Sequence, residues 1–191
     1  IKCIVLDTNS GPAVTRNRAI KEAKGRYIAF LDADDLWMPQ KLEKQIAFMQ
    51  NKNIALSYTG YYRIEETSGE TIDQIHIPKR VGYAELLKQN IIGCLTAIYD
   101  TEKIGKVYMP DIRKRQDFGV WLKILKRVPY DYGIDEPFAY YSVHSSSVSS
   151  NKIQASLYNW KLYREVEKLP WYKAVYYFTW YTYRSFLKYR K

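Results

Sequence analysis

Residues 25–37 read GRYIAFLDADDLW, in which a short apolar run is followed directly by three aspartates. The run Tyr27–Leu31 has the length and composition of a strand that is buried on both faces of a sheet. Asp32, Asp34 and Asp35 follow its carboxyl end, where open α/β sheets place their ligand crevice. The stretch therefore predicts an α/β domain with a polar site at the end of this strand.

The aspartate cluster needs an explanation, because carboxylates this close together repel one another unless a positive charge lies among them. A hard divalent cation that bridges to substrate phosphates would supply that charge, since Mg²⁺ and Mn²⁺ take oxygen ligands from carboxylates, phosphates and water. A solvated acidic turn, with Asp35 capping the next helix, explains the same residues. The cluster alone leaves both interpretations open.

The composition indicates a globular protein. A length of 191 residues suits one domain with an extra element or two, and 47% of the residues are hydrophobic. The two cysteines, Cys3 and Cys94, lie in apolar segments, and reduced, buried thiols suit a cytosolic compartment. The sequence contains neither a signal peptide nor the ~20 consecutive apolar residues of a membrane span.

The positive charge is concentrated in the last part of the chain. The net charge is +10, and residues 152–191 hold nine Lys or Arg against two Glu, a balance of +7. The preceding 151 residues carry only +3. Arguments from charge therefore concern the C-terminal segment.

Periodicity predicts alternating strands and helices, followed by a helical segment. The expected strands are 1–7, 27–31, 54–64, 71–77, 94–99, 130–134 and 138–143, and the expected helices are 13–24, 39–49, 83–89 and 117–128. From residue 153 onward the pattern is helical, with a break at Leu169-Pro170. We expect a mixed-sheet α/β domain over 1–151 and a basic, aromatic helical segment over 152–191.

Two further segments carry groups suited to chemistry. Residues 11–18 read GPAVTRNR, a turn that enters a helix bearing two arginines, which makes either an anion site or a solvated face. Asp117 opens an amphipathic helix, where a carboxylate either accepts a proton from a substrate hydroxyl or caps the helix. His144, in a serine-rich loop, is either a metal or phosphate ligand or an exposed side chain.

Taken in order, GPAVTRN at 11–17 and GRYIAFLDADD at 25–35 resemble the inverting glycosyltransferases of family 2, with Thr15 where the family commonly has Ala. The resemblance extends to about residue 151. It implies the GT-A fold of nucleotide-diphospho-sugar transferases, a three-layer sandwich with a mixed, mainly parallel sheet, plus C-terminal helices. It also implies that the first βαβ unit is missing from the N-terminus, because the chain opens directly in a strand and lacks the family's Asp-Asp-Gly-Ser segment.

The resemblance implies roles for the acidic and basic residues. Asp32 and Asp34 match the Asp-x-Asp that holds Mn²⁺ or Mg²⁺ against the diphosphate of the donor. Asp32 is also expected to contact the nucleotide sugar. Arg16 matches an arginine beside the nucleotide. Asp117 matches the catalytic base. The metal would neutralise the charge that develops on the nucleoside diphosphate as it leaves.

It also implies further contacts with the donor. Gln116 and Trp121 belong to the segment RQDFGVW at 115–121, which is similar to the family's E/Q-D-x-x-x-W. Residues 140–149 read YYSVHSSSVS and resemble the stretch that closes the donor site, with His144 as a metal and nucleotide ligand. Tyr141 stands where the family usually has Arg.

The C-terminal segment raises a separate question. Residues 171–191 contain ten aromatic residues interleaved with Lys and Arg, which is typical of a helix at an anionic membrane surface. Packing against the catalytic domain, or against a second subunit in a homo-oligomer, is the alternative. Proteins that bind single-stranded nucleic acids also interleave basic and aromatic residues. No compact RNA-binding signature is present, so we expect no nucleic-acid partner.

The expected function is transfer of a sugar from a nucleotide-sugar donor to a growing surface glycan or a lipid-linked oligosaccharide. We expect the donor to be UDP-linked. The resemblance is closest to enzymes of capsule, lipopolysaccharide or teichuronic-acid assembly. We expect the protein in the cytoplasm, peripheral to the inner face of the cell membrane. A nucleotidyltransferase of similar fold and a non-enzymatic membrane- or nucleic-acid-binding module are the alternatives.

Overall fold

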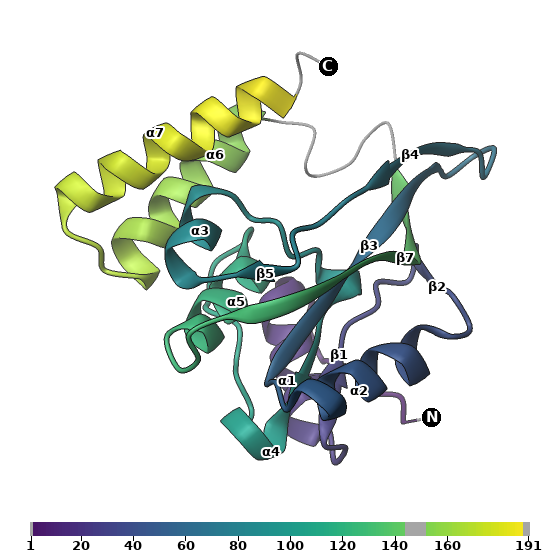
Figure 1. Cartoon of the computed structure of the whole chain (residues 1–191). Helices are drawn as coiled ribbons and strands as arrows, with labels where there is room; N and C mark the ends of the chain where they lie inside the picture. Colours follow the sequence, from purple (N-terminus) through teal and green to yellow (C-terminus); the bar gives the residue numbers. More distant parts are fainter. Residues whose placement is uncertain (1, 144–151, 189–191) are drawn as a thin grey trace.

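The computed structural model describes residues 2–143 and 152–188, and within them seven strands form one mixed sheet with helices on both faces (Figure 1). The strands are β1 (Tyr27–Ala29), β2 (Leu36–Trp37), β3 (Leu56–Glu65), β4 (Thr71–Ile75), β5 (Arg80–Val81), β6 (Ile98–Asp100) and β7 (Asp131–Val143). The α-helices are α1 (Gly11–Glu22), α2 (Lys41–Lys52), α3 (Tyr83–Lys88), α4 (Thr101–Ile104), α5 (Gln116–Leu125), α6 (Lys152–Lys161) and α7 (Trp171–Lys188). A 3₁₀ helix η1 (Cys94–Thr96) and a π-helical turn η2 (Leu162–Val166) complete them. The predicted α/β class is confirmed.

The order of the main strands is β1-β6-β3-β7-β2, with β4 paired to β3 and β5 paired to β7. Strand β6 lies between β1 and β3 and runs antiparallel to both, whereas β3 and β7 are parallel. Strands β1, β3 and β7 therefore share one direction, but among the described strands only β3 and β7 pair in parallel. The prediction of a mixed sheet is confirmed, and that of mainly parallel pairing is wrong because β6 separates two strands that run the same way.

Strand β1 is an edge strand, not a central one. It pairs only with β6 in the described sheet and ends at Ala29, and the following Leu31 is 45% exposed. The prediction of a strand buried on both faces over 27–31 is therefore wrong. Ile28 and Phe30 do enter the core, so the apolar run still fixes the position of the aspartates that follow it.

Residues 130–134 and 138–143, predicted as two strands, form the single strand β7. Its pairing with β3 shifts register on either side of Gly60, which lies opposite Pro137. A Cβ on Gly60 would lie 3.1 Å from the carbonyl oxygens of both Glu136 and Ile75. The irregular register accommodates a proline that cannot donate to the ladder, and glycine permits the close backbone approach.

Two other sequence-based expectations need correction. Residues 2–7 were expected to form a strand but do not, because none of the described residues pairs with them. A β-strand requires backbone hydrogen bonds to a neighbouring strand. The predicted strand 94–99 is instead η1 followed by β6. The sequence analysis also missed β2, β5 and α4, which are too short to show a period.

The two faces of the sheet have different chemistry, as alternation along β3 shows. Leu56 and Tyr58 point into the hydrophobic core beneath α1 and α5, which also contains the fully buried Trp121. Ser57 is buried on the opposite face, where its hydroxyl accepts a hydrogen bond from Gln45 of α2 at 2.9 Å. One face of the central strand is thus apolar and the other is polar although buried.

The buried polar face surrounds Lys41, the first residue of α2, which has no exposed surface. Its ammonium donates to Gln45 Oε1 at 2.5 Å and to the carbonyl oxygen of Thr96 at 3.1 Å. The indole N–H of Trp37 donates to the neighbouring carbonyl of Leu95 at 2.8 Å. These donors from α2 and β2 fix the η1 turn, which also carries Cys94.

The C-terminal helices pack on the α/β domain. Glu167, which is 8% exposed, accepts a hydrogen bond from the hydroxyl of Tyr83 in α3 and forms an ion pair with Lys126, just beyond α5, at 2.7 Å. The hydroxyl of Tyr163 donates to the carbonyl of Leu87. Figure 1 shows α6 and α7 stacked outside α3 and α5. The predicted break at Leu169-Pro170 separates η2 from α7 as expected.

Burial lowers the pKa of Lys41 from 10.5 to about 7, which makes stability depend on pH. Between those two values the unfolded chain binds a proton that the folded protein lacks, so the free energy of unfolding should rise with pH. Lys41→Met should remove that rise, which is at most about 1.4 kcal/mol per pH unit. Urea denaturation at about pH 7.5 and about pH 9 would measure it. Lys52→Met, on the exposed end of the same helix, is the control, and parallel pH dependences for Lys41→Met and the wild type would contradict the prediction.

Candidate functional site

Arg16 lies at the centre of the candidate site. It projects from α1, and its guanidinium forms an ion pair with a carboxylate oxygen of Asp32 in the loop after β1. Its charge also interacts with Asp117 at the start of α5. The structure therefore brings together three residues that the sequence analysis selected independently, from segments up to 101 positions apart.

The three aspartates of the cluster have separate environments. Asp32 faces Arg16, and Asp34 is exposed. Asp35 is only 5% exposed, and its Oδ1 accepts a hydrogen bond from the backbone N–H of Ser142 in β7 at 3.1 Å. The Ser142 hydroxyl in turn donates to the carbonyl of Asp34. Asp35 thus joins the acidic loop to the sheet, and Asp32 and Asp34 remain at the surface of the site.

Arg16 also changes the electrostatic argument for a metal. Its guanidinium supplies a positive charge within the aspartate cluster, so repulsion alone does not require a cation. No group of three or more His, Cys, Asp or Glu side chains suited to a metal ion occurs in the described parts of the chain. The exposed carboxylate of Asp34 and the partly exposed one of Asp32 still suit a hard cation whose remaining ligands are phosphate and water.

Asp117 lies at the start of α5, in surroundings that change the pKa of its carboxyl. Desolvation raises its carboxyl pKa above 3.8, while the backbone N–H of Phe118 and the charges of Arg115 and Arg16 lower it in part. The residue is half-buried at the start of α5. Backbone N–H groups in the first turn of α5 hold the carboxylate in place, but the N-cap of the helix is Arg115, so the expected capping role is not found. The role of Asp117 as a base stays a prediction.

The structure adds Arg115 and Cys94 to the site. Arg115 is the N-cap of α5 and adopts a left-handed conformation, with φ at +66°, which is uncommon for a residue other than glycine. Its guanidinium donates to the hydroxyl of Tyr181 in α7 at 2.6 Å. Cys94 lies near the charges of Arg16 and Asp117, and burial raises the pKa of its thiol. Arg115 lies in the family-like segment 115–121, but neither its contact with Tyr181 nor the position of Cys94 could be seen in the sequence, because both join distant segments.

The two other predicted site residues of α5 are buried. Gln116 is 7% exposed, and Trp121 is fully buried, with its ring 6.1 Å from that of Phe30 in a T-shaped arrangement. These positions give Trp121 a packing role and fix α5 to the core. The contacts of Gln116 and Trp121 with a donor stay predictions. His144 lies outside the described residues.

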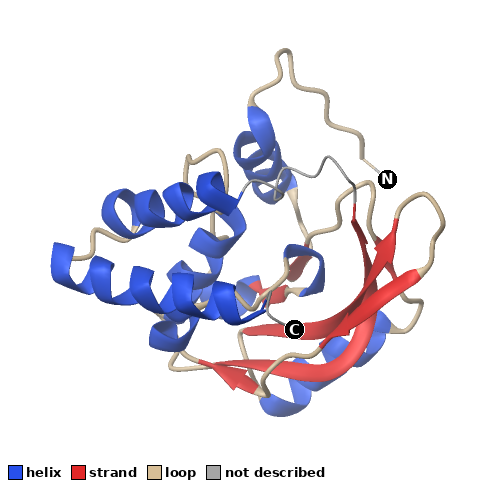
Figure 2. Ribbon diagram, turned by 90° about the horizontal axis from the view of Figure 1, so that it is seen from above, coloured by secondary structure: helices blue, strands red, loops and turns tan. Residues whose placement is uncertain are grey.

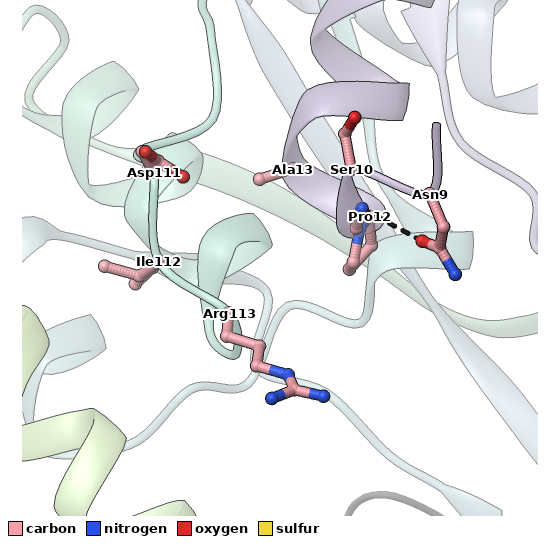
Figure 3. Close-up of a pocket in the computed structure, with 8 residues that line it drawn as sticks. Asn9, Ser10, Pro12, Ala13, Asp111, Ile112 and Arg113 are labelled. Carbon is pink, nitrogen blue, oxygen red and sulfur yellow. Dashed lines mark hydrogen bonds between the residues drawn. The ribbon is translucent and has the colours of Figure 1, made fainter. Parts of the chain in front are cut away.

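A pocket lies at the start of α1, the helix that carries Arg16 (Figure 3). Its volume is about 420 Å³, and it lies between residues 9–13 and residues 111–113. Within it the backbone N–H of Gly11 donates to the side chain of Asn9 at 3.2 Å. One wall is the first turn of the helix that carries Arg16, and the other leads to Asp117. Asp111 lines the pocket, whereas Asp32, Asp34 and Asp117 do not.

The fold and the arrangement of acidic groups around Arg16 define a class of transferase domain, and comparison with known proteins identifies the family. Residues 1–106 match Glycosyl transferase family 2, and the chain belongs to this family. The match ends before Asp117, so the role of that residue depends on its geometry.

Relatives in bacteria support the assignment. The chain is 45% identical over 182 residues to TuaG of Bacillus subtilis (strain 168), whose name assigns it to teichuronic acid biosynthesis as a glycosyltransferase; the match covers 95% of this chain and 72% of TuaG. It is 39% identical over 154 residues to the Escherichia coli UDP-Glc:alpha-D-GlcNAc-diphosphoundecaprenol beta-1,3-glucosyltransferase WfaP, covering 81% of this chain and 60% of WfaP.

Solved structures show the same fold. TarS of S. aureus, residues 1–349 in complex with UDP-GlcNAc, superposes with a TM-score of 0.65 at 18% identity, covering 95% of this chain and 55% of that one. The chain thus spans about half the length of this structural relative. At this level of identity the likeness shows the GT-A-type fold alone.

Replacement of Asp117 should stabilise the protein. Its raised pKa means that stability is lost as pH rises from 3.8 through the folded-state value, so at neutral pH the buried charge is unfavourable. Asp117→Asn keeps the shape and removes the charge, and the melting temperature should rise, by about 2–4 °C for each kcal/mol gained. Thermal melts beside Asp111→Asn, an exposed carboxylate, would test this. A lower melting temperature for Asp117→Asn would show that its charge stabilises the fold.

Proposed function

We propose that the protein transfers a sugar from a UDP-linked donor to a growing surface polysaccharide or a lipid-linked oligosaccharide, with inversion at the anomeric carbon. The observation that carries the proposal is the position of Arg16, which brings the acidic loop after β1 and Asp117 into one site. Family membership supports the reaction class. The names of TuaG and WfaP support the substrate class.

Asp117 acts as the general base. The hydroxyl oxygen of the acceptor forms a bond to the anomeric carbon, and its proton passes to the Asp117 carboxylate. The bond from the anomeric carbon to the diphosphate oxygen breaks, and its electron pair leaves with the nucleoside diphosphate. A carboxyl pKa raised by burial makes Asp117 a better proton acceptor near neutral pH.

Arg16 and the acidic loop act at the leaving group. When bound, Mn²⁺ or Mg²⁺ neutralises the charge that develops on the diphosphate, and Asp34 and Asp32 would hold it. Arg16 would stabilise the same charge if the departing phosphates lie beside the loop after β1, because its guanidinium is paired to Asp32 of that loop. His144 is retained as a proposed ligand from the segment 140–149.

The acceptor determines where the enzyme works. WfaP acts on a diphosphoundecaprenol-linked sugar, which is a lipid-linked acceptor. None of the helices in the described residues is long and apolar enough to cross a membrane. The acceptor of WfaP supports a position for this protein at the inner face of the cell membrane, peripheral to the bilayer.

The test of this function is transfer from UDP-sugars to a lipid-linked acceptor by the intact protein, with and without Mn²⁺. Product with the opposite anomeric configuration to the donor, and dependent on the divalent ion, is the expected result. Nucleotidyl transfer to a sugar phosphate in place of glycosyl transfer would favour the alternative activity.

The neighbouring residues Asp34 and Asp35 should separate function from stability. Asp34→Ala should abolish the transfer that depends on Mn²⁺. The melting temperature should change little, because Asp34 is exposed. Asp35→Ala leaves the buried N–H of Ser142 without this acceptor and should lower stability by about 1–3 kcal/mol. Metal titration and thermal melts on both variants measure the difference. Full Mn²⁺ dependence in Asp34→Ala would contradict the role given to that carboxylate.

Loss of the proposed base should affect turnover more than donor binding. Asp117→Asn should lower the turnover number at least ~10²-fold, the scale expected when a general base is removed. Donor affinity, measured by calorimetry with the UDP-sugar, should change little. A variant that loses donor affinity but turns over each bound donor normally would give Asp117 a structural role.

A further inference from the structure

Helix α7 lies at the outside of the molecule (Figures 1 and 2). Aromatic residues lie on two of its faces. One packs inward: Ala174 is fully buried, Tyr181 is 8% exposed, and the ring of Phe178 lies 5.4 Å from that of Trp160 in α6. This face fulfils the expectation that the segment packs against the catalytic domain. It does not account for the other face.

The second face points away from the protein. Its residues recur at helical spacing on the side opposite Ala174, and all are large and exposed: Tyr172, Val175, Tyr176, Trp180 and Tyr183. Trp171 extends the row at the helix start and is 70% exposed. The rings contact one another along the helix, with centroids 6.5 Å apart for Tyr176–Trp180 and 6.0 Å apart for Trp180–Tyr183. We call these six residues the outer face of α7.

Basic residues flank the outer face along one edge. The ammonium of Lys88 in α3 lies 5.9 Å from the ring of Tyr176 and 5.4 Å from that of Trp180, and Arg184 lies 5.9 Å from the ring of Trp180. Lys173, on the same edge of the helix, is exposed. Residues 171–188 contain neither Asp nor Glu. The surface is thus a stripe of Trp and Tyr beside a cationic edge.

We propose that the outer face of α7 docks on the surface of an anionic lipid bilayer. Trp and Tyr are the residues whose rings sit at the level of lipid headgroups, and Lys and Arg beside them meet anionic headgroups. The inference rests on the proposed function only for its purpose, which is to bring the site to a lipid-linked acceptor.

Charge favours a bilayer over a second copy of the chain. In a two-fold dimer the same face meets itself, and with the two α7 helices antiparallel Lys173 would approach Arg184 of the second copy, where like charges repel. Anionic lipid offers the complementary charge. The position of the helix also suits this role, because Tyr181, on its inner face, binds Arg115 next to Asp117. Docking would therefore hold the candidate site close to the membrane surface.

The experiment is flotation of the intact protein with vesicles of phosphatidylcholine, with and without phosphatidylglycerol, at low and high salt. The wild type should bind the anionic vesicles and be released by salt, because exposed charges are screened over about 10 Å at 0.1 M ionic strength. Tyr176→Ser combined with Tyr183→Ser should weaken binding at least tenfold. Tyr108→Ser combined with Tyr130→Ser, two exposed tyrosines on other elements, is the matched control and should bind normally.

A second pair of variants covers the case in which the aromatic substitutions disturb the fold. Lys173→Glu combined with Arg184→Glu changes the edge of the outer face and should lower binding to anionic vesicles at least tenfold, while the thermal melt stays close to that of the wild type. Hydrolysis of soluble UDP-sugar should stay unchanged in these variants. If the wild type binds anionic vesicles but transfers no sugar, the proposed function fails and the docking surface stands.

Three results would overturn the inference. The first is absence of the wild type from floated anionic vesicles at low salt. The second is equal vesicle binding by the wild type and by well-folded variants of the outer face. The third is a dimer in solution that the Tyr176→Ser, Tyr183→Ser variant converts to a monomer, because a second copy would then cover the face.

Discussion

The ion pair between Arg16 and Asp32 is the contact on which the arrangement of the site depends. It joins α1 to the loop after β1, and the same guanidinium acts on Asp117 of α5. A cluster of three aspartates is tolerated because this charge lies within it and because Asp35 turns away to bind the backbone of Ser142. The site is therefore held by charges from three elements that the core brings together.

The buried side of the sheet opposite the hydrophobic core supports this arrangement. Lys41 and Gln45 bind the carbonyl of Thr96, and Trp37 binds that of Leu95, so the η1 turn is fixed from α2 and β2. A lysine buried without a carboxylate on its ammonium is unfavourable while charged. The network lowers stability at neutral pH, and our hypothesis is that it holds the η1 turn, which contains Cys94, in a fixed position.

The sequence predicts those parts of the site that are encoded locally. Asp32 and Asp34 follow an apolar run, and Asp117 begins an amphipathic helix, so each has a pattern of its own. The direction of β6 and the contact between Arg115 and Tyr181 have no local pattern, because they depend on which distant segments pack together. Trp121 lies in a family-like segment, yet burial shows a packing role that composition could not distinguish from binding.

The central claim is that the acidic loop and Asp117 form one site around Arg16. A crystal structure of the intact protein with a UDP-sugar and Mn²⁺ tests it most directly, through the anomalous signal of the metal. The account predicts Mn²⁺ bound to oxygens of Asp34 or Asp32 and of the diphosphate, with Arg16 at the phosphates and Asp117 on the far side of the anomeric carbon. A diphosphate bound away from residues 32–34, or a sugar that Asp117 does not face, would contradict it.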